Sequence, residues 1–435
     1  MNLMIAAIAP DASGELSLIP FITTHWQFCL LHLLQFGIWG AWFVVLGNML
    51  EARGFSRPVI GRIYATIPIG SMIAALVVGV LADKYFNVEW VIGVSHLIGA
   101  GLLFAMARTF SPWKFYGLAL AYGIAFAPTL NLVNAVVFRH DADVFNNLAD
   151  EGFPWIRVFG TIGWILAGLS HALILKKGQP INGNPLYLAS ALSVILGFYA
   201  FTLPATPPTE GAAELSVMET VESTLEGIVG MVSSNPVFFF VTFVAAMAMG
   251  LYFAFAALFL EKTGVPSRTV GPVMTIGQWI EIIFMFSLPV LLGTDNVNMN
   301  IILFVGITAW AVRFGFFAIG RPLGLVLFGI AIHGICFDFF FAAGMINANL
   351  IAPDELAATA QGVYGFLVYG LGMFVGSEAS GWLNATLTRK ASADEEQQPG
   401  DEVAAPTITN WRVFWAVPCV TVGIAAIMFG IAVFS

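Results

Sequence analysis

The sequence is poor in charged residues, since Asp, Glu, Lys and Arg make up only 10% of its 435 residues. A soluble globular domain carries about 25% charged residues, so this composition argues against a water-soluble fold. Hydrophobic residues reach 59%, and the mean hydropathy is +0.87. These values are typical of a protein that lies in a lipid bilayer.

Basic residues and cysteines are also scarce. The chain has 17 Lys and Arg against 26 Asp and Glu, and no basic patch interleaved with aromatic residues occurs, which excludes nucleic acid as a partner. Cys29, Cys336 and Cys419 lie in apolar runs without paired spacing, so we predict small buried side chains. A G-x-x-x-x-G-K-[ST] loop is missing, which argues against an ATP-driven pump, and we expect no cofactor or metal.

Long apolar runs are abundant. Runs of about 20 residues, the length needed to cross a bilayer, recur along the whole chain. We therefore predict an all-α integral membrane protein with twelve transmembrane helices in two six-helix bundles. The predicted spans lie near 27–50, 58–82, 89–109, 114–138, 155–176, 185–204, 235–260, 269–293, 299–319, 323–349, 357–386 and 409–434.

Polar stretches divide these spans. Residues 217–228 lie in an acidic linker and are expected to form a short amphipathic helix at the membrane surface. The stretch RKASADEEQQPGDEVAAPT, residues 389–407, is expected to form a flexible loop. The N-terminus lacks the pattern of a cleaved signal. The predicted organisation is an N-terminal extension (1–26), a first bundle (27–204), a central cytoplasmic linker (205–234) and a second bundle (235–435).

The two halves contain similar short segments. Residues 123–127 read GIAFA in the predicted fourth helix, and residues 334–338 read GICFD in the tenth. Each segment is followed by an Asn-Ala pair, which indicates an internal repeat of the kind that builds a central pathway in transporters. In this comparison Asp338 belongs to the second half only.

Ionisable side chains inside the spans are the most informative residues, because burying them is costly and they usually face a water-filled cavity. Arg157, Glu281 and Asp338 are of this kind. An alternative for Arg157 and Glu281 is a buried ion pair that fixes helix packing. Arg313 is closer to the end of its span, where its long side chain could reach the membrane surface.

Helical spacing places further residues beside these charges. Thr161 and Trp164 follow Arg157 at i+4 and i+7 and share its helix face. Gln278 and Glu281 are three residues apart. His333 and Phe337 are at i and i+4, with Asp338 about 100° further round the helix. Such stripes are poor lipid-facing surface but suit the lining of a polar ligand site.

Several segments together resemble the nucleoside:proton symporters of the major facilitator superfamily. The likeness runs through nearly all predicted spans. Its most specific part is that the segments with charged and polar residues occur in the family's order and in the matching helices. The matching segments are LQFGIWGAW (34–42), GVLADK (79–84), PTLNLVN (128–134), FPWIRVFGTIGW (153–164), GQWIEIIF (277–284), AWAVRFGFFAIG (309–320), GICFDFF (334–340) and AQG (360–362).

The resemblance implies a transporter, not an enzyme, that takes up nucleosides with protons across a bacterial inner membrane by alternating access. It implies Glu281 and Asp338 as the proton-coupling residues. It also implies that the protein works as a monomer in the lipid bilayer with both termini in the cytoplasm, although the Lys and Arg of the short loops predict the opposite orientation. The substrate-binding residues expected from the resemblance and the spacing together are Arg157, Thr161, Trp164, Gln278, Glu281, His333, Phe337 and Asp338.

The sequence departs from the family pattern at some substrate-binding positions. Gly250 and Phe253 stand where the family usually has Gln and Asn, His333 where Tyr is expected, and Trp164 where Phe is expected. The coupling acids are intact, but two polar contacts to the substrate are missing. A proton-coupled symporter of another small polar solute, such as a sugar, therefore remains the alternative.

Overall fold

The computed structural model describes residues 18–74, 86–140, 149–208, 217–292, 298–352, 360–390 and 407–435. Two sequence predictions lie outside these residues. They are the segment GVLADK at 79–84 and most of the predicted loop, 391–406.

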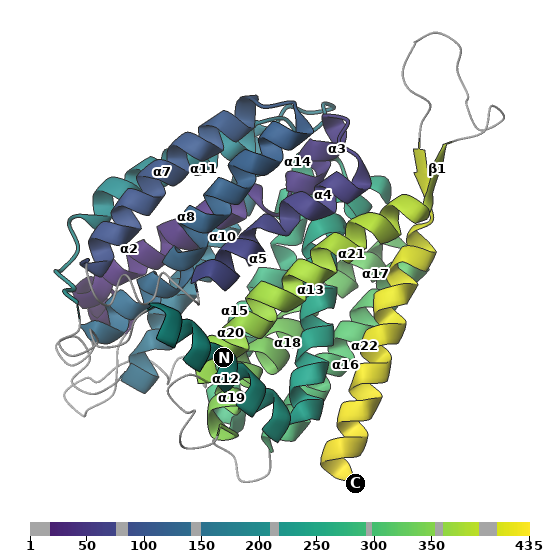
Figure 1. The fold of residues 1–435 in the computed structure, drawn as a ribbon. Helices are drawn as coiled ribbons and strands as arrows, with labels where there is room; N and C mark the ends of the chain where they lie inside the picture. Colours follow the sequence, from purple (N-terminus) through teal and green to yellow (C-terminus); the bar gives the residue numbers. More distant parts are fainter. Residues whose placement is uncertain are drawn as a thin grey trace.

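The first half of the chain is a bundle of helices coloured purple to blue in Figure 1. Apolar side chains fill its interior, and Tyr122, Phe126 and Trp42 are among those with almost no exposed surface. The elements of this half are α2 (Leu18–Trp42), α3 (Leu46–Ala52), α4 (Arg57–Tyr64), α5 (Thr66–Ile73), α7 (Val88–Arg108), α8 (Pro112–Arg139), α10 (Ala149–Ile174) and α11 (Asn184–Ala200).

The second half forms a bundle that lies beside the first (Figure 1). Among its described residues are two π-helical segments, each inside an apolar span. Its elements are α13 (Pro236–Lys262), α14 (Ser267–Met274), α15 (Ile276–Leu292), α16 (Met299–Ile319), α17 (Leu323–Ala331), α18 (His333–Cys336), the π-helix η2 (Phe337–Ala342), α19 (Ala343–Leu350), α20 (Ala360–Gly365), the π-helix η4 (Phe366–Gly372), α21 (Met373–Thr386) and α22 (Trp411–Phe434).

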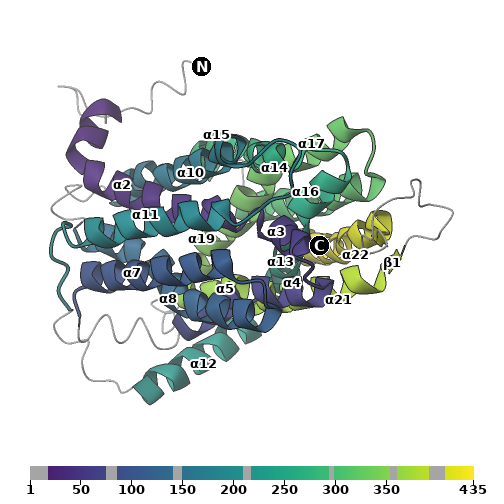
Figure 2. The same ribbon diagram turned by 90° about the horizontal axis from the view of Figure 1, so that it is seen from above.

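The expected amphipathic helix of the linker is present as α12 (Val217–Ser234) and extends six residues beyond its predicted end. It lies at the periphery of the molecule in Figure 2. The predicted loop before the last helix begins and ends in a short antiparallel pair that the sequence did not predict, β1 (Thr388–Lys390) with β2 (Thr407–Thr409).

In the part of the chain that the structure describes, eight helices are long and apolar enough to cross a membrane, or nine if the bent pair Leu323–Ala331 and His333–Leu350 is one span. The predicted number of twelve is not confirmed by this count. The reason is that other apolar segments are short or interrupted. The helix α11 has only 17 residues. The second predicted span is broken at Ala65, and its last residues, 75–82, lie outside the described part.

The internal repeat has a structural counterpart in two helix crossings. A Cβ atom on Gly123 of α8 would lie 2.4 Å from the carbonyl oxygen of Thr66, and one on Gly334 of α18 would lie 2.7 Å from the backbone nitrogen of Glu281. Real Cβ atoms do not come so close, so both crossings require glycine. The matching segments GIAFA and GICFD thus place the backbones of two neighbouring helices in contact, and in the second half that contact includes Glu281.

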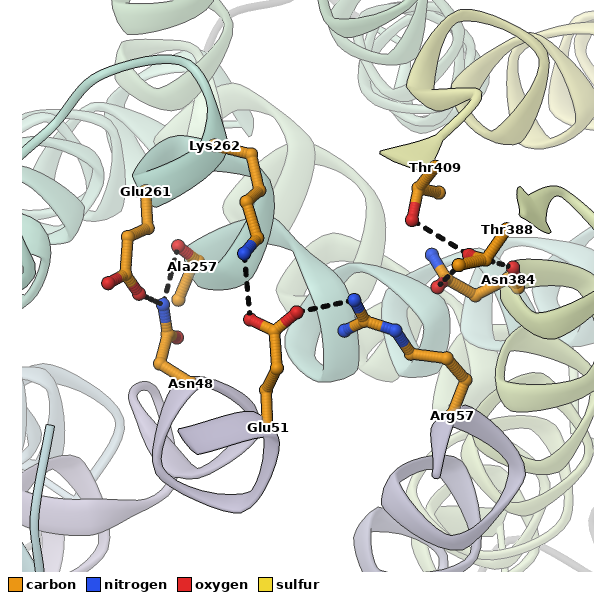
Figure 3. A network of polar contacts seen from close by, with 9 residues as sticks. All are labelled: Asn48, Glu51, Arg57, Ala257, Glu261, Lys262, Asn384, Thr388 and Thr409. Carbon is orange, nitrogen blue, oxygen red and sulfur yellow. Dashed lines mark hydrogen bonds and ion pairs between the residues drawn. The ribbon is translucent and has the colours of Figure 1, made fainter. Parts of the chain in front are cut away.

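Polar contacts join the two bundles at one end (Figure 3). Asn48 of α3 donates a hydrogen bond to the carbonyl oxygen of Ala257 (3.2 Å) and contacts the carboxylate of Glu261 on α13. Glu51 pairs with Arg57 of its own bundle and with Lys262 of the other bundle, at 3.3 Å from the Lys262 Nζ atom. We call Asn48, Glu51, Arg57, Glu261 and Lys262 the inter-bundle network.

Candidate functional site

Glu281 is the centre of the candidate site and is only 8% exposed. Its Oε1 atom accepts a hydrogen bond of 3.1 Å from the Thr161 hydroxyl. Its Oε2 atom lies 3.7 Å from the Nε2 atom of His333. Thr161 belongs to α10 in the first bundle and His333 to α18 in the second, so each oxygen of this carboxylate has a partner in a different bundle.

Arg157 lies one helical turn before Thr161 on α10 and is half-buried. Its guanidinium group lies 4.1 Å above the ring of Phe36. Among the described residues no carboxylate lies within 4.0 Å of Arg157, so the structure does not contain the alternative buried ion pair with Glu281. The guanidinium group is nevertheless close enough to attract the carboxylates of both Glu281 and Asp338.

Asp338 lies in the π-helix η2 and is 3% exposed. In the described part of the chain its Oδ2 atom has no hydrogen-bond partner. The carboxylates of Asp338 and Glu281 repel each other when both are ionised. Ionised carboxylates are costly inside a membrane, and these two are both buried.

The π-helix η2 is stabilised by side chains from neighbouring helices. The hydroxyl of Tyr364 lies 3.2 Å from the carbonyl oxygen of Phe341, and the indole of Trp310 donates a 2.8 Å hydrogen bond to the carbonyl oxygen of Cys336 just before the segment. π-Helical turns leave irregular backbone bonding and are frequent at functional sites. The two side chains thus donate hydrogen bonds to backbone carbonyl groups in and beside the irregular turn that carries Asp338.

Aromatic side chains form another part of the site. Trp164 packs edge-on against Trp39, with ring centroids 5.4 Å apart, and lies 6.4 Å from the ring of Phe253 on α13. Phe337 is half-buried and packs against His333 at 5.7 Å. Trp164 thus shares its helix with Thr161, and Phe337 packs against His333, the two residues that contact Glu281 directly.

Gln278 lies one turn before Glu281 on α15 and is buried. Its Oε1 atom has no hydrogen-bond partner among the described residues. A buried amide oxygen without a partner is costly, and such a group is suited to receive a hydrogen bond from a ligand.

Gly250 has a structural role that the sequence comparison did not predict. A Cβ atom at this position would lie 2.7 Å from the carbonyl oxygen of Met373 and 3.1 Å from its Cα atom, where α13 crosses α21. A larger side chain therefore does not fit without moving α21. Phe253 is different, because its ring lies beside Trp164 in the site.

Two residues of the site region were missed by sequence reasoning or placed wrongly. Tyr369 in η4 interacts electrostatically with Arg157 and Glu281, and no charge or spacing pattern marks it in the sequence. Arg313 was given a position near the membrane surface. This alternative is wrong, because Arg313 has no exposed surface and its Nη1 atom lies 2.9 Å from the Nδ1 atom of His333.

Comparison with known proteins points to one family. A family model described as "Nucleoside H+ symporter" matches residues 22–434. YegT of Escherichia coli (strain K12), a candidate nucleoside transporter, is 32% identical over 91% of this chain and 90% of its own length. The xanthosine permease of the same organism is 29% identical over 81% of this chain and 86% of its own length.

A solved structure supports the same relationship at the level of the fold. A variant of the nucleoside transporter NupG superposes with a TM-score of 0.80, at 25% sequence identity, covering 95% of this chain and 100% of NupG. This match confirms the predicted major facilitator fold.

Proposed function

The chain belongs to the nucleoside:proton symporter family, and from this premise we propose that Glu281 and Asp338 carry the coupled proton while residues of both bundles hold the nucleoside. The protein is a transporter and not an enzyme. The observation that carries the proposal is the division of the Glu281 partners, with Thr161 in one bundle and His333 in the other.

This arrangement connects protonation to the relative position of the bundles. Glu281 and Asp338 are buried and repel each other when ionised, so a proton bound to the pair lowers the cost of holding both in the site. Separation of the bundles removes the Thr161 hydroxyl from Glu281 and lets the carboxylate exchange its proton. An inward proton gains about 2.3 kcal/mol for each 100 mV of membrane potential, which can drive accumulation of the substrate.

The same site offers groups that suit a nucleoside. The rings of Trp164, Phe253 and Phe337 provide flat apolar surface for a base. Gln278 presents an amide oxygen without a partner among the described residues, which can accept a hydrogen bond from the base or the sugar. Arg157 is half-buried and can donate to sugar or base oxygens.

We place the protein in the bacterial inner membrane as a monomer with cytoplasmic termini, as its resemblance to the family implies. In that orientation the inter-bundle network lies at the periplasmic end, because α2 and α3 run from the cytoplasmic side to Glu51. The count of loop charges predicts the opposite orientation and can be tested with cysteine labelling from either side of the membrane.

The test of the coupling role is Asp338→Asn in cells without other nucleoside transporters. Asn is neutral and nearly the same size, so the variant should lose uphill accumulation of labelled uridine but keep exchange of labelled for unlabelled uridine. Accumulation that remains normal and is still abolished by a protonophore would contradict the proposal. Addition of sugars as competitors tests the alternative substrate class, because a sugar transporter would lose uridine uptake in their presence.

A further inference from the structure

Arg313 is the most deeply buried cation of the described residues, and the proposed function does not use it. It lies on α16 with no exposed surface, and its guanidinium carbon is 3.6 Å from the centroid of the Tyr252 ring. No carboxylate lies within 4.0 Å of it among the described residues, and its Nε and Nη2 atoms have no hydrogen-bond partner there. Its Nη1 atom lies 2.9 Å from the Nδ1 atom of His333, and the side chain also interacts with the Cys336 thiol and the Tyr252 hydroxyl.

The chemistry of this contact fixes the position of one hydrogen atom. An arginine side chain only donates hydrogen bonds, so the Nδ1 atom of His333, 2.9 Å from Nη1 of Arg313, must accept. A neutral histidine that accepts at Nδ1 carries its hydrogen on Nε2. The Nε2 atom lies 3.7 Å from Oε2 of Glu281, so this N–H group lies next to the carboxylate.

We infer that Arg313 and His333 are positioning residues for proton coupling: Arg313 holds His333 in the tautomer whose Nε2–H group stabilises the Glu281 carboxylate after its proton has left. This inference rests on the proposed function of Glu281. It also gives a role to a buried cation that has no carboxylate partner among the described residues, because the positive charge acts on Glu281 through the imidazole ring.

The positions of Arg313, His333 and Glu281 in one bundle indicate when in the transport cycle their contacts act. Arg313, His333 and Glu281 all belong to the second bundle, whereas Thr161 belongs to the first. When the bundles move apart, the Thr161 hydrogen bond is lost but the His333 contact moves with Glu281. The imidazole N–H is therefore the partner that stays with the carboxylate in both arrangements of the bundles.

Other groups also act on this carboxylate. Arg157 from α10 attracts it, Asp338 from η2 repels it when ionised, and Tyr369 from η4 interacts with it. The distinctive feature of His333 is that its Nε2–H donor is set by Arg313, whose other contacts are the rings of Tyr252, Trp310 and Phe317. A test must therefore separate the Nε2 atom from the Nδ1 atom.

Two substitutions at one position make this separation. In His333→Asn the amide lies near the former Nδ1 atom, where it can accept from Arg313 but does not reach Glu281. In His333→Gln the amide lies near the former Nε2 atom and can donate to Glu281. If His333 only provides an acceptor for Arg313, Asn should replace it better than Gln.

We expect His333→Asn to lower proton-driven uridine accumulation at least about tenfold, the loss typical of one hydrogen bond to a charged group, and to lower exchange of labelled for unlabelled uridine by a smaller factor. His333→Gln should retain more of the accumulation than His333→Asn. Arg313→Gln should behave like His333→Asn, because glutamine can donate or accept and no longer fixes the tautomer. Expression and thermal stability of each purified variant are measured alongside transport.

Equal accumulation by the Asn and Gln variants, or a better result for Asn, would overturn the inference. If Arg313→Gln fails to fold, the pair at position 333 still decides it. Glu281→Gln in the same assay separates the two proposals. Loss of accumulation in Glu281→Gln with normal accumulation in His333→Asn rejects the positioning role alone, whereas normal accumulation in Glu281→Gln rejects the coupling function itself.

Discussion

Gly334→Ala is expected to lower proton-driven uptake about tenfold, although alanine is the smallest side chain that can be added. The crossing of α18 and α15 at this residue brings His333 and Glu281 within reach of each other. A Cβ atom on Gly334 would lie 2.7 Å from the nitrogen and 2.8 Å from the Cα atom of Glu281. All its near neighbours are backbone atoms of α15, so no side-chain rotation relieves the contact.

The size of the effect follows from these distances. Ordinary contact begins at 3.4 Å, so the two helices must separate by about 0.7 Å. The present distance of 3.7 Å between His333 and Glu281 then exceeds 4 Å, and the interaction weakens further. Overpacking of this kind costs about 1–3 kcal/mol of stability, which leaves a folded protein in most cases.

The assay is accumulation of labelled uridine in cells without other nucleoside transporters, together with the melting temperature of the purified variant. Gly324→Ala is the matched control, because it lies in the same predicted span and a Cβ atom there meets nothing within 4 Å. Transport by the Gly334→Ala variant at the wild-type rate would refute the claim that this crossing sets the geometry of Glu281.

Three further predictions test other contacts. Thr161→Val should slow proton-driven uptake about tenfold, because Glu281 loses a hydrogen bond worth about 1.5 kcal/mol. Thr161→Ser keeps the hydroxyl and should keep the uptake rate, so equal rates for the Val and Ser variants would contradict this prediction. Gly250→Gln should lower the melting temperature without improving nucleoside binding, because its Cβ atom meets the backbone of α21. A stable variant that binds nucleoside more tightly would show that α13 and α21 leave room for a side chain at this position. Tyr364→Phe should cost about 1 kcal/mol of unfolding free energy, because the carbonyl group of Phe341 loses its donor, and an unchanged thermal unfolding curve would argue against that contact.

Much of the fold follows from local properties of the sequence. The length and apolar character of the runs predict transmembrane helices, and the amphipathic pattern of 217–228 predicts the helix α12. The interruptions were not predicted. The π-helix η2 contains no proline, and it depends on Tyr364 and Trp310, which come from other parts of the chain. Such tertiary contacts leave no local pattern.

The candidate site shows the same limit. Spacing predicted that Arg157, Thr161 and Trp164 share one helix face, and in the structure all three lie on α10, where Thr161 contacts Glu281. Arg313 was misplaced because its position along the span suggested surface, whereas its burial is set by Tyr252 on another helix. Gly250 was read as a lost polar contact because the sequence does not show which helix crosses there.

The inter-bundle network has a consequence for the speed of opening. Glu51 has one cation in its own bundle, Arg57, and one in the other, Lys262. When this end opens, Arg57 travels with Glu51, so the carboxylate is never left without a counter-ion. The group released is the ammonium of Lys262, whose side chain is already 43% exposed and therefore partly hydrated. Exposed ion pairs are worth at most about 1 kcal/mol and weaken with salt, so the Lys262 pair adds little to the barrier. The hydrogen bonds of Asn48 with Ala257 and Glu261 are the contacts whose breaking limits the opening of this end.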